Sequence, residues 1–443
     1  MKPFIIALAC LLAAPVSAQK RWTLEECIRQ AIANNIDLKQ ARLTQDARRI
    51  DLSTSKNSWL PTLNAGLGQD FDFSRSPSNN GLIVDYNSAS SSAGLQLDMP
   101  LFDGFKTSND IAAKKLDLRA AVESLRKAQD DLAVNVASYY LQVLYEKEIL
   151  RIAELAKALT RQQVEKTQLL VDNGKAPRSQ LYDIKAQLAK DEVTRTDADN
   201  DLRLALLNLA QLLELERDSS DFDIATPDLS AYHPEADDGL PSPQLVYEQA
   251  VGIKPVILEQ EYLLDSRKKA VKVARAAYFP QLSLSMSYTN YYYHYSGSDV
   301  QNISFADQIK QNERKTIGFT LSIPIFNRFA TRNGVRQARV AVFTQELALE
   351  NARKSLYKEI QQAWLNAVSS QKKYISATRS VASSEEAYKY AEERYATGKS
   401  DVFDYGEAKN KYAQSLADQA QAKYDYLFRK KILEFYQGIP FSL

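Results

Sequence analysis

The stretch Met99-Pro100-Leu101-Phe102 recurs as Ile323-Pro324-Ile325-Phe326, and this pair decides the fold. The two prolines lie 224 residues apart, and Asn173-Gly174-Lys175 recurs as Thr397-Gly398-Lys399 with the same offset. Upstream, Leu60-Pro61 matches Phe279-Pro280 with an offset of only 219 residues. The chain therefore consists of two sequence repeats. Because exposed loops tolerate insertions, we expect the extra residues of the second copy in a loop between two strands.

Apolar residues alternate with polar or small ones on either side of these prolines. The pattern begins at Thr62 and returns in 92–99, 282–288 and 316–323. Strict alternation is typical of strands between two unlike environments. It predicts two β-hairpins, 62–99 and 281–323, with strands close to the length that crosses a bilayer at a tilt. For either hairpin alone, half-buried strands of a soluble sandwich remain the alternative.

Four tyrosines end one of the predicted strands, namely Tyr291, Tyr292, Tyr293 and Tyr295. Aromatic rings at strand ends suit the girdle where a membrane meets water. We therefore predict a membrane girdle at these four residues.

Residues 107–173, 178–226 and 335–397 contain neither Gly nor Pro. These long segments predict helices over 107–173, 178–215, 331–397 and 401–437. Patterns that run far beyond ~25 residues without interruption indicate coiled coils. The first segment also carries a narrow apolar stripe that would pack against a neighbouring helix. That stripe comprises Leu118, Val122, Leu125, Leu132, Val136, Tyr139, Val143 and Leu150.

The predicted organisation is thus a first repeat, 19–227, a linker, 228–243, and a second repeat, 244–443. Each repeat holds a helix, a hairpin, a long helix, a tight turn and another long helix, so the fold class is mainly α with a small β part. Four lipid-facing strands cannot close a barrel, since the smallest membrane barrels need about eight. An open edge in hydrocarbon would leave backbone groups unpaired. Several copies must therefore pool their strands.

Residues 1–18 have the features of a secretory signal peptide, with Lys2 before an apolar core and small residues before Gln19. A lipoprotein signal through Cys10 is an alternative that would shorten that core. Elsewhere no run of ~18 apolar residues predicts a transmembrane helix.

Composition excludes several functions. The chain has 56 Lys and Arg against 55 Asp and Glu, and the positive and negative residues are interspersed along the sequence. The sequence therefore shows no basic patch of the kind that binds nucleic acid. The mature chain would keep one cysteine, Cys27, and it has two distant histidines, His233 and His294. This leaves no disulfide, no cysteine metal cluster and no evident catalytic constellation. We predict a protein that is not an enzyme and has no metal or cofactor.

The chain resembles the TolC-like outer-membrane efflux protein family over essentially its whole mature length. The resemblance rests on the doubled organisation, on the turn glycines Gly174 and Gly398, and on four junction motifs. These are Trp59-Leu60-Pro61, Tyr278-Phe279-Pro280, Met99-Pro100-Leu101-Phe102-Asp103-Gly104 and Ile323-Pro324-Ile325-Phe326-Asn327.

The resemblance implies a homotrimer with a twelve-stranded transmembrane β-barrel and a long α-helical coiled-coil barrel. The β part would lie in the outer membrane of a Gram-negative bacterium and the helical part in the periplasm. It also implies two partners, a periplasmic adaptor (membrane fusion) protein and an inner-membrane transporter, and passive passage of substrates in efflux or type I secretion. A structural or adhesive trimeric coiled-coil stalk of the cell surface is the alternative function.

The resemblance places a periplasmic gate near the second helix turn, at Tyr395, Asp404 and Glu407. Asp404 and Glu407 share a helix face, and repeated around an axis they would form rings that favour cations. The alternative is an ordinary solvated acidic face. Members of the family often carry Arg two residues after the turn glycine, where this chain has Ser400.

The two helix turns are the predicted adaptor-docking sites, with simple helix termination as the alternative role. They comprise Gly174, Lys175, Ala176, Pro177, Gly398, Lys399, Ser400 and Asp401.

Overall fold

The structure is a computed structural model that describes residues 21–77, 81–215, 222–227, 240–296 and 302–442. The chain forms two compact units, one of Met1–Arg42, Leu125–Pro255 and Arg353–Leu443, the other of Leu43–Ser124 and Val256–Ala352. Each unit takes segments from both sequence repeats, so the compact units do not coincide with the predicted repeats. The predicted signal peptide, with Cys10, and most of the predicted linker lie outside the described residues.

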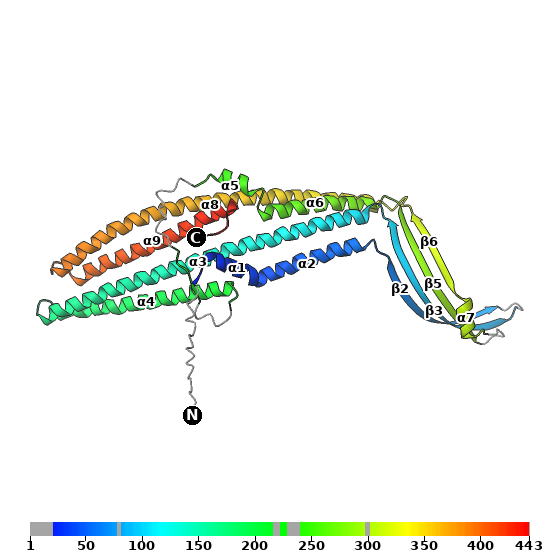
Figure 1. Cartoon of the computed structure of the whole chain (residues 1–443), viewed down its shortest axis with the longest axis horizontal. Helices are drawn as coiled ribbons and strands as arrows, with labels where there is room; N and C mark the ends of the chain where they lie inside the picture. Colours follow the sequence, from blue (N-terminus) through cyan, green and yellow to red (C-terminus); the bar gives the residue numbers. More distant parts are fainter. Residues whose placement is uncertain (1–20, 78–80, 216–221, 228–239, 297–301, 443) are drawn as a thin grey trace, which may run out of the picture. The chain divides into compact units, whose positions relative to one another are not determined.

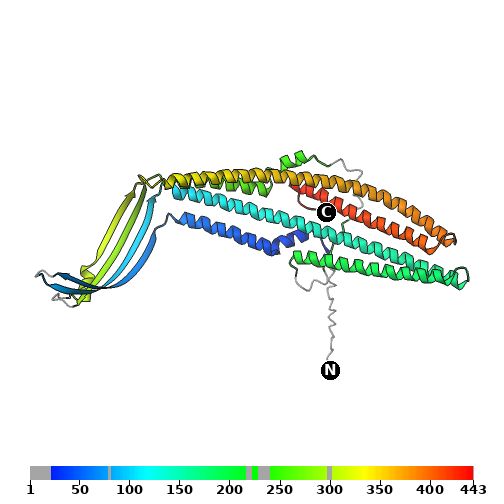
Figure 2. The ribbon, with the colours of Figure 1, turned by 180° about the vertical axis from the view of Figure 1, so that it is seen from behind.

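Two helical hairpins form most of the first unit, and their lengths repeat. Helix α3 (Lys106–Asp172, 67 residues) precedes α4 (Arg178–Leu212, 35 residues), and α8 (Ala330–Ala396, 67 residues) precedes α9 (Val402–Tyr436, 35 residues). Figures 1 and 2 show α4 running back along α3, and α9 along α8. Every helix boundary of the first hairpin returns 224 residues later, so the repeat is preserved at the level of single residues.

Both hairpins turn through a left-handed glycine, with φ of 68° at Gly174 and 71° at Gly398. Only Gly adopts this conformation at little cost. The next N–H donates to a carbonyl five residues back, from Lys175 to Leu170 and from Lys399 to Arg394, each at 2.8 Å. These bonds close the two helix ends in the Schellman arrangement.

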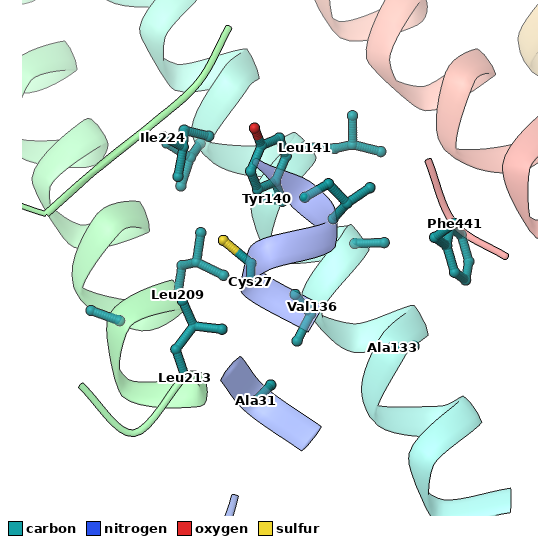
Figure 3. Close-up of a cluster of buried hydrophobic side chains, with 14 of the residues drawn as sticks. Cys27, Ala31, Ala133, Val136, Tyr140, Leu141, Leu209, Leu213, Ile224 and Phe441 are labelled. Carbon is teal, nitrogen blue, oxygen red and sulfur yellow. The ribbon is translucent and has the colours of Figure 1, made fainter. Parts of the chain in front are cut away.

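The core of the first unit forms where α1 (Leu24–Asn34) packs between α3 and α4 (Figure 3). Thr23 and Glu26 begin α1 with a reciprocal capping box. Cys27 and Ala31, one helical turn apart, are fully buried in this core. A parallel pair of two-residue strands, β1 (Arg21–Trp22) and β4 (Asp223–Ile224), lies beside it. Helix α5 (Pro243–Ala250) belongs to the same unit.

The predicted apolar stripe of α3 is wrong at one position. Tyr139 is 42% exposed, whereas Tyr140 is 1% exposed. The Tyr140 hydroxyl lies 2.7 Å from the carbonyl oxygen of Ala225 and 3.2 Å from that of Trp22. The short β1–β4 strand pair thus provides hydrogen-bond acceptors for the buried hydroxyl of Tyr140. As a result, α3 buries Tyr140 at this position instead of the predicted Tyr139.

The second unit contains one antiparallel sheet, in the order β2-β3-β5-β6 (Figure 1). Its strands are β2 (Thr62–Pro77), β3 (Ile83–Phe102), β5 (Gln281–Ser296) and β6 (Arg314–Ser322). Helices α2 (Ile36–Asn57) and α6 (Pro255–Ala276) lead into β2 and β5. The two hairpins lie where the sequence predicts them, and the central β3–β5 pair joins one repeat to the other.

The extra residues of the second repeat lie between β5 and β6, as expected, but part of that connection is helical. Helix α7 (Phe305–Gln311) begins at Ser304, whose hydroxyl accepts from the N–H of Asp307. Carboxamide side chains in this connection, one from α7 and one from Asn302 before it, pair with the backbone of β5 beyond the end of β6. Gln308 accepts from the N–H of Tyr293 and donates to its carbonyl, both at 2.8 Å, and Asn302 does the same for Tyr295. These side chains satisfy an edge that would otherwise be unpaired.

Gly104 is the position in the second unit where a side chain fits least. Its φ is +67°, and an added Cβ would lie 2.7 Å from both the Ala276 oxygen and the Phe279 Cβ. We expect Gly104→Ala to lower the free energy of unfolding by about 1–3 kcal/mol from overpacking, with a further ~1 kcal/mol from the left-handed backbone. Chemical denaturation in detergent measures this. Gly66→Ala is the control, because nothing lies within 4 Å of its added Cβ. Equal losses in both variants would contradict the expectation.

Candidate functional site

The sheet has one apolar and one polar face. Leu63, Leu97, Met286 and Ile317 are directly aligned across the four strands. One residue along, the aligned row on the other face is Asn64, Gln96, Ser287 and Thr316. The apolar face is open in the single chain: exposed fractions are 89% for Leu67, 68% for Ile317 and 69% for Phe319. An apolar surface that spans a whole sheet indicates contact with lipid or with another chain.

The four girdle tyrosines do not share a face. Tyr291, Tyr293 and Tyr295 align with Ser92, Ser90 and Ser88 on the polar face. Their rings stack in series, with centroids 6.1 Å and 6.4 Å apart. Only Tyr292 projects on the apolar side, where its ring meets Phe305 edge-on at 5.2 Å. A membrane girdle on the apolar face could include Tyr292 but not the other three tyrosines, and the girdle itself stays a prediction.

The second helix turn separates the three predicted gate residues. Tyr395 is 6% exposed, and its hydroxyl lies 3.1 Å from that of Thr167 on α3. Its ring stacks on Tyr405 with centroids 5.4 Å apart. Tyr395 therefore packs inside the unit, and its role as a gate residue stays a prediction. Asp404 and Glu407 are exposed, as a ring of acidic side chains would require.

Ser400 contacts one of these carboxylates directly. Its hydroxyl donates to Asp404 at 2.8 Å. The helix begins one residue later, where the Asp401 side chain accepts from the N–H of Asp404 at 2.9 Å. Ser400 thus orients Asp404 and leaves its negative charge in place. An arginine at that position would neutralise the charge.

A cluster of aromatic side chains fills the space behind this turn. Tyr388, Tyr395 and Tyr405 are buried together with Ile184 of α4, and Tyr412 packs against them. The hydroxyls of Tyr388 and Tyr405 lie 3.3 Å apart. Burial raises the pKa of Tyr388, Tyr405 and Tyr412 above the ordinary tyrosine value.

These pKa shifts predict a loss of stability at alkaline pH. A raised pKa favours the protonated form in the folded state, so this stability is complete below the unfolded pKa of about 10 and is lost as the pH rises above it. Tyr405→Phe removes one ionising group, so we expect it to lose less stability than the unmodified chain between about pH 9 and pH 11. Tyr390→Phe is the control on α8, since Tyr390 is 66% exposed. An identical alkaline loss in all three proteins, measured by thermal denaturation, would contradict this.

A buried ion pair connects the two hairpins. Lys409 of α9 donates to the Asp191 carboxylate of α4 at 2.5 Å and to the Thr160 hydroxyl of α3 at 2.7 Å. Thr160 in turn donates to Asp191 at 2.5 Å, and Gln187 donates to the second carboxylate oxygen at 2.8 Å. The two charged side chains are 2% and 8% exposed. Such a pair fixes which helix faces meet, because either charge alone would be costly to bury.

The sequence interpretation missed this pair, although it carries a signal. Asp191 stands seven residues from Ile184 and from Ala198, and all three are buried. An acidic residue at a buried heptad position predicts a cationic or hydrogen-bonding partner on the neighbouring helix. The identity of that partner becomes visible only when α9 packs against α4.

Among the described residues, no helix combines the length and apolar character that a membrane span requires. Within the same ranges, no three or more His, Cys, Asp or Glu side chains come together as metal ligands could.

The chain matches the family model described as "Outer membrane efflux protein" over residues 27–214 and 246–438. The chain belongs to this outer membrane efflux protein family. The match skips the link between the repeats, and it supports the predicted family, the mainly helical fold and the outer-membrane location.

Individual members of the outer membrane efflux protein family match along most of their length. The chain is similar to the outer membrane efflux protein BepC of Brucella suis, with 24% identity over 81% of this chain and 74% of BepC. It is 23% identical to TolC of Escherichia coli over 97% of this chain and 84% of TolC. The solved structure of CusC shares the fold, with a TM-score of 0.76, 19% identity and coverage of 94% of this chain and 92% of CusC.

Proposed function

We propose that three copies of this chain assemble into a channel that gives substrates passive passage across the outer membrane. The observation that carries the proposal is the sheet of four strands with one apolar face exposed along its length. Within the ranges that the structure describes, its outer strands, β2 and β6, each have only one neighbour in the sheet. Four strands are too few for a membrane barrel, and unpaired edges cannot lie in hydrocarbon. Pairing of β6 with β2 of the next copy removes both edges.

The polar face of the sheet would then line the interior of the pooled barrel. It carries small polar residues such as Asn64, Gln96, Ser287 and Thr316. Such residues suit a wet interior rather than a packed one. The stacked Tyr291, Tyr293 and Tyr295 would face the same interior, near one end of the barrel.

The helical hairpins would continue the passage away from the membrane. Their turns, Gly174 to Pro177 and Gly398 to Asp401, are the proposed contacts for a periplasmic adaptor that links the channel to an inner-membrane transporter. Asp404 and Glu407 are exposed just beyond the second turn, so three copies would place two rings of carboxylates there. Such rings favour the passage of cations.

Conductance of the purified protein in a planar lipid bilayer tests this function. We expect discrete conductance steps and a reversal potential that favours cations. Glu407→Gln should weaken that preference, whereas Glu386→Gln, an exposed residue on α8 that pairs with Lys389, should leave it unchanged. A protein that inserts but never conducts would instead support the structural stalk.

A further inference from the structure

The polar network around Lys409 has an incomplete counterpart in the second hairpin. Adding the repeat offset of 224 carries Thr160 to Ser384 and Asp191 to Ser415. These two serines also meet, with their hydroxyl oxygens 2.5 Å apart, and they are only 6% and 5% exposed. Among the described residues of the chain, no lysine contacts this serine pair as Lys409 contacts the first network.

The serine pair has the chemistry to accept a further donor. Each hydroxyl carries one proton and two lone pairs. These two protons can serve two of three contacts at a time: the one within the pair, and those to the carbonyls of Val381 and Tyr412, at 3.1 Å and 2.8 Å. In the described part of the chain, the serines have no other side-chain partner. Lone pairs on both oxygens therefore remain open, and an ammonium group would satisfy them.

The residue equivalent to Lys409 is Lys185 on α4, again 224 positions away. Lys185 is exposed, and among the described residues it makes no hydrogen bond or ion pair. Within one chain, Lys409 of the second hairpin reaches the first hairpin. The two hairpins are repeats of one unit, so the arrangement that places the second hairpin beside the first can be repeated between copies. That repetition brings the first hairpin of another copy beside the second hairpin of this one. Its Lys185 then takes the place that Lys409 takes in the first network.

We propose that Lys185 of one copy donates to the Ser384–Ser415 hydroxyl pair of the neighbouring copy. The inference rests on the proposed assembly of several copies, and it adds the contact that joins them along the helices. Lys409 binds a carboxylate within a copy, whereas Lys185 binds neutral hydroxyls between copies. A bond between two charged groups is stronger than one between a charged and a neutral group, so the Lys185 contact is the weaker of the two.

The test compares the rates at which detergent-purified trimers of full-length variants dissociate in dodecyl sulfate. Lys185→Met is expected to speed dissociation at least about tenfold, or ~1.4 kcal/mol. Lys190→Met is the matched control, an exposed lysine of the same helix, and should stay near the unmodified rate. Both replacements are on the surface of the single chain, so both variants should fold.

A second variant gives an effect whose sign depends on the contact. Ser415→Asp introduces the carboxylate that the first network has, so it should slow dissociation about tenfold when Lys185 is present. In the Lys185→Met background the same carboxylate lacks a partner and should speed dissociation. An equal effect in both backgrounds, or a Lys185→Met rate equal to that of Lys190→Met, would overturn the inference while the trimer stands. A single copy in the unmodified protein would instead overturn the proposed function.

Discussion

Replacing Asp191 by Ala is expected to lower the free energy of unfolding by about 3–5 kcal/mol, because it leaves the Lys409 ammonium buried without its partner. Lys409 is 1% exposed, so water cannot replace the lost carboxylate. Removing both charges in Asp191→Leu with Lys409→Met should recover most of the loss, since a buried pair replaced by apolar residues of similar volume is often neutral. Chemical denaturation followed by helix content measures all three variants.

Asp51→Ala is the control for this prediction. Asp51 pairs with Arg48 at 3.1 Å, but the two side chains are 44% and 51% exposed. Exposed pairs of this kind contribute about 0.2–1 kcal/mol. If Asp191→Ala cost no more than Asp51→Ala, the ion pair would not hold the two hairpins together.

Ile317→Arg is expected to prevent or severely weaken insertion into lipid vesicles. An arginine on the lipid-facing side of a membrane strand costs about 2–4 kcal/mol near the midplane. Ile317 lies on the exposed apolar face of β6, and a trimer would carry the change three times. Insertion is measured by refolding the protein into phosphatidylcholine vesicles and scoring the fraction protected from added protease.

The neighbouring residue supplies the control. Thr316 precedes Ile317 in the same strand and aligns with Ser287 on the polar face. Thr316→Arg should insert nearly as well as the unmodified protein, because its side chain would lie in the wet interior. Equal defects at the two positions would show that the apolar face does not contact lipid.

The architecture could be predicted from the sequence because each decisive motif occurs in both repeats, so two independent segments support the same helix or strand. Gly174 and Gly398 each end a helix of 67 residues, and the alternating runs around Pro100 and Pro324 form the four strands. Helix α7 (Phe305–Gln311) was not predicted, because this segment lies between two predicted strands, where a loop is the expectation. Equivalent residues of the first repeat, which are rich in β-formers such as Ile83, continue strand β3 instead.

The site residues were harder to predict, and one error could have been avoided. The apolar positions of β5 are even-numbered, from Leu282 to Tyr288, so strict alternation already sets Tyr291 and Tyr293 on the other face. The burial of Tyr395 has no such signal. It depends on Thr167 and Tyr405, from two other helices, and contacts of that kind cannot be read from spacing within one helix.

The number of copies in the detergent-purified protein tests the central claim most directly. Native mass spectrometry should give three times the mass of one mature chain, because only pooled strands can close the sheet whose apolar face and edges are open. A single chain that stays monomeric and dissolved without detergent would contradict the account.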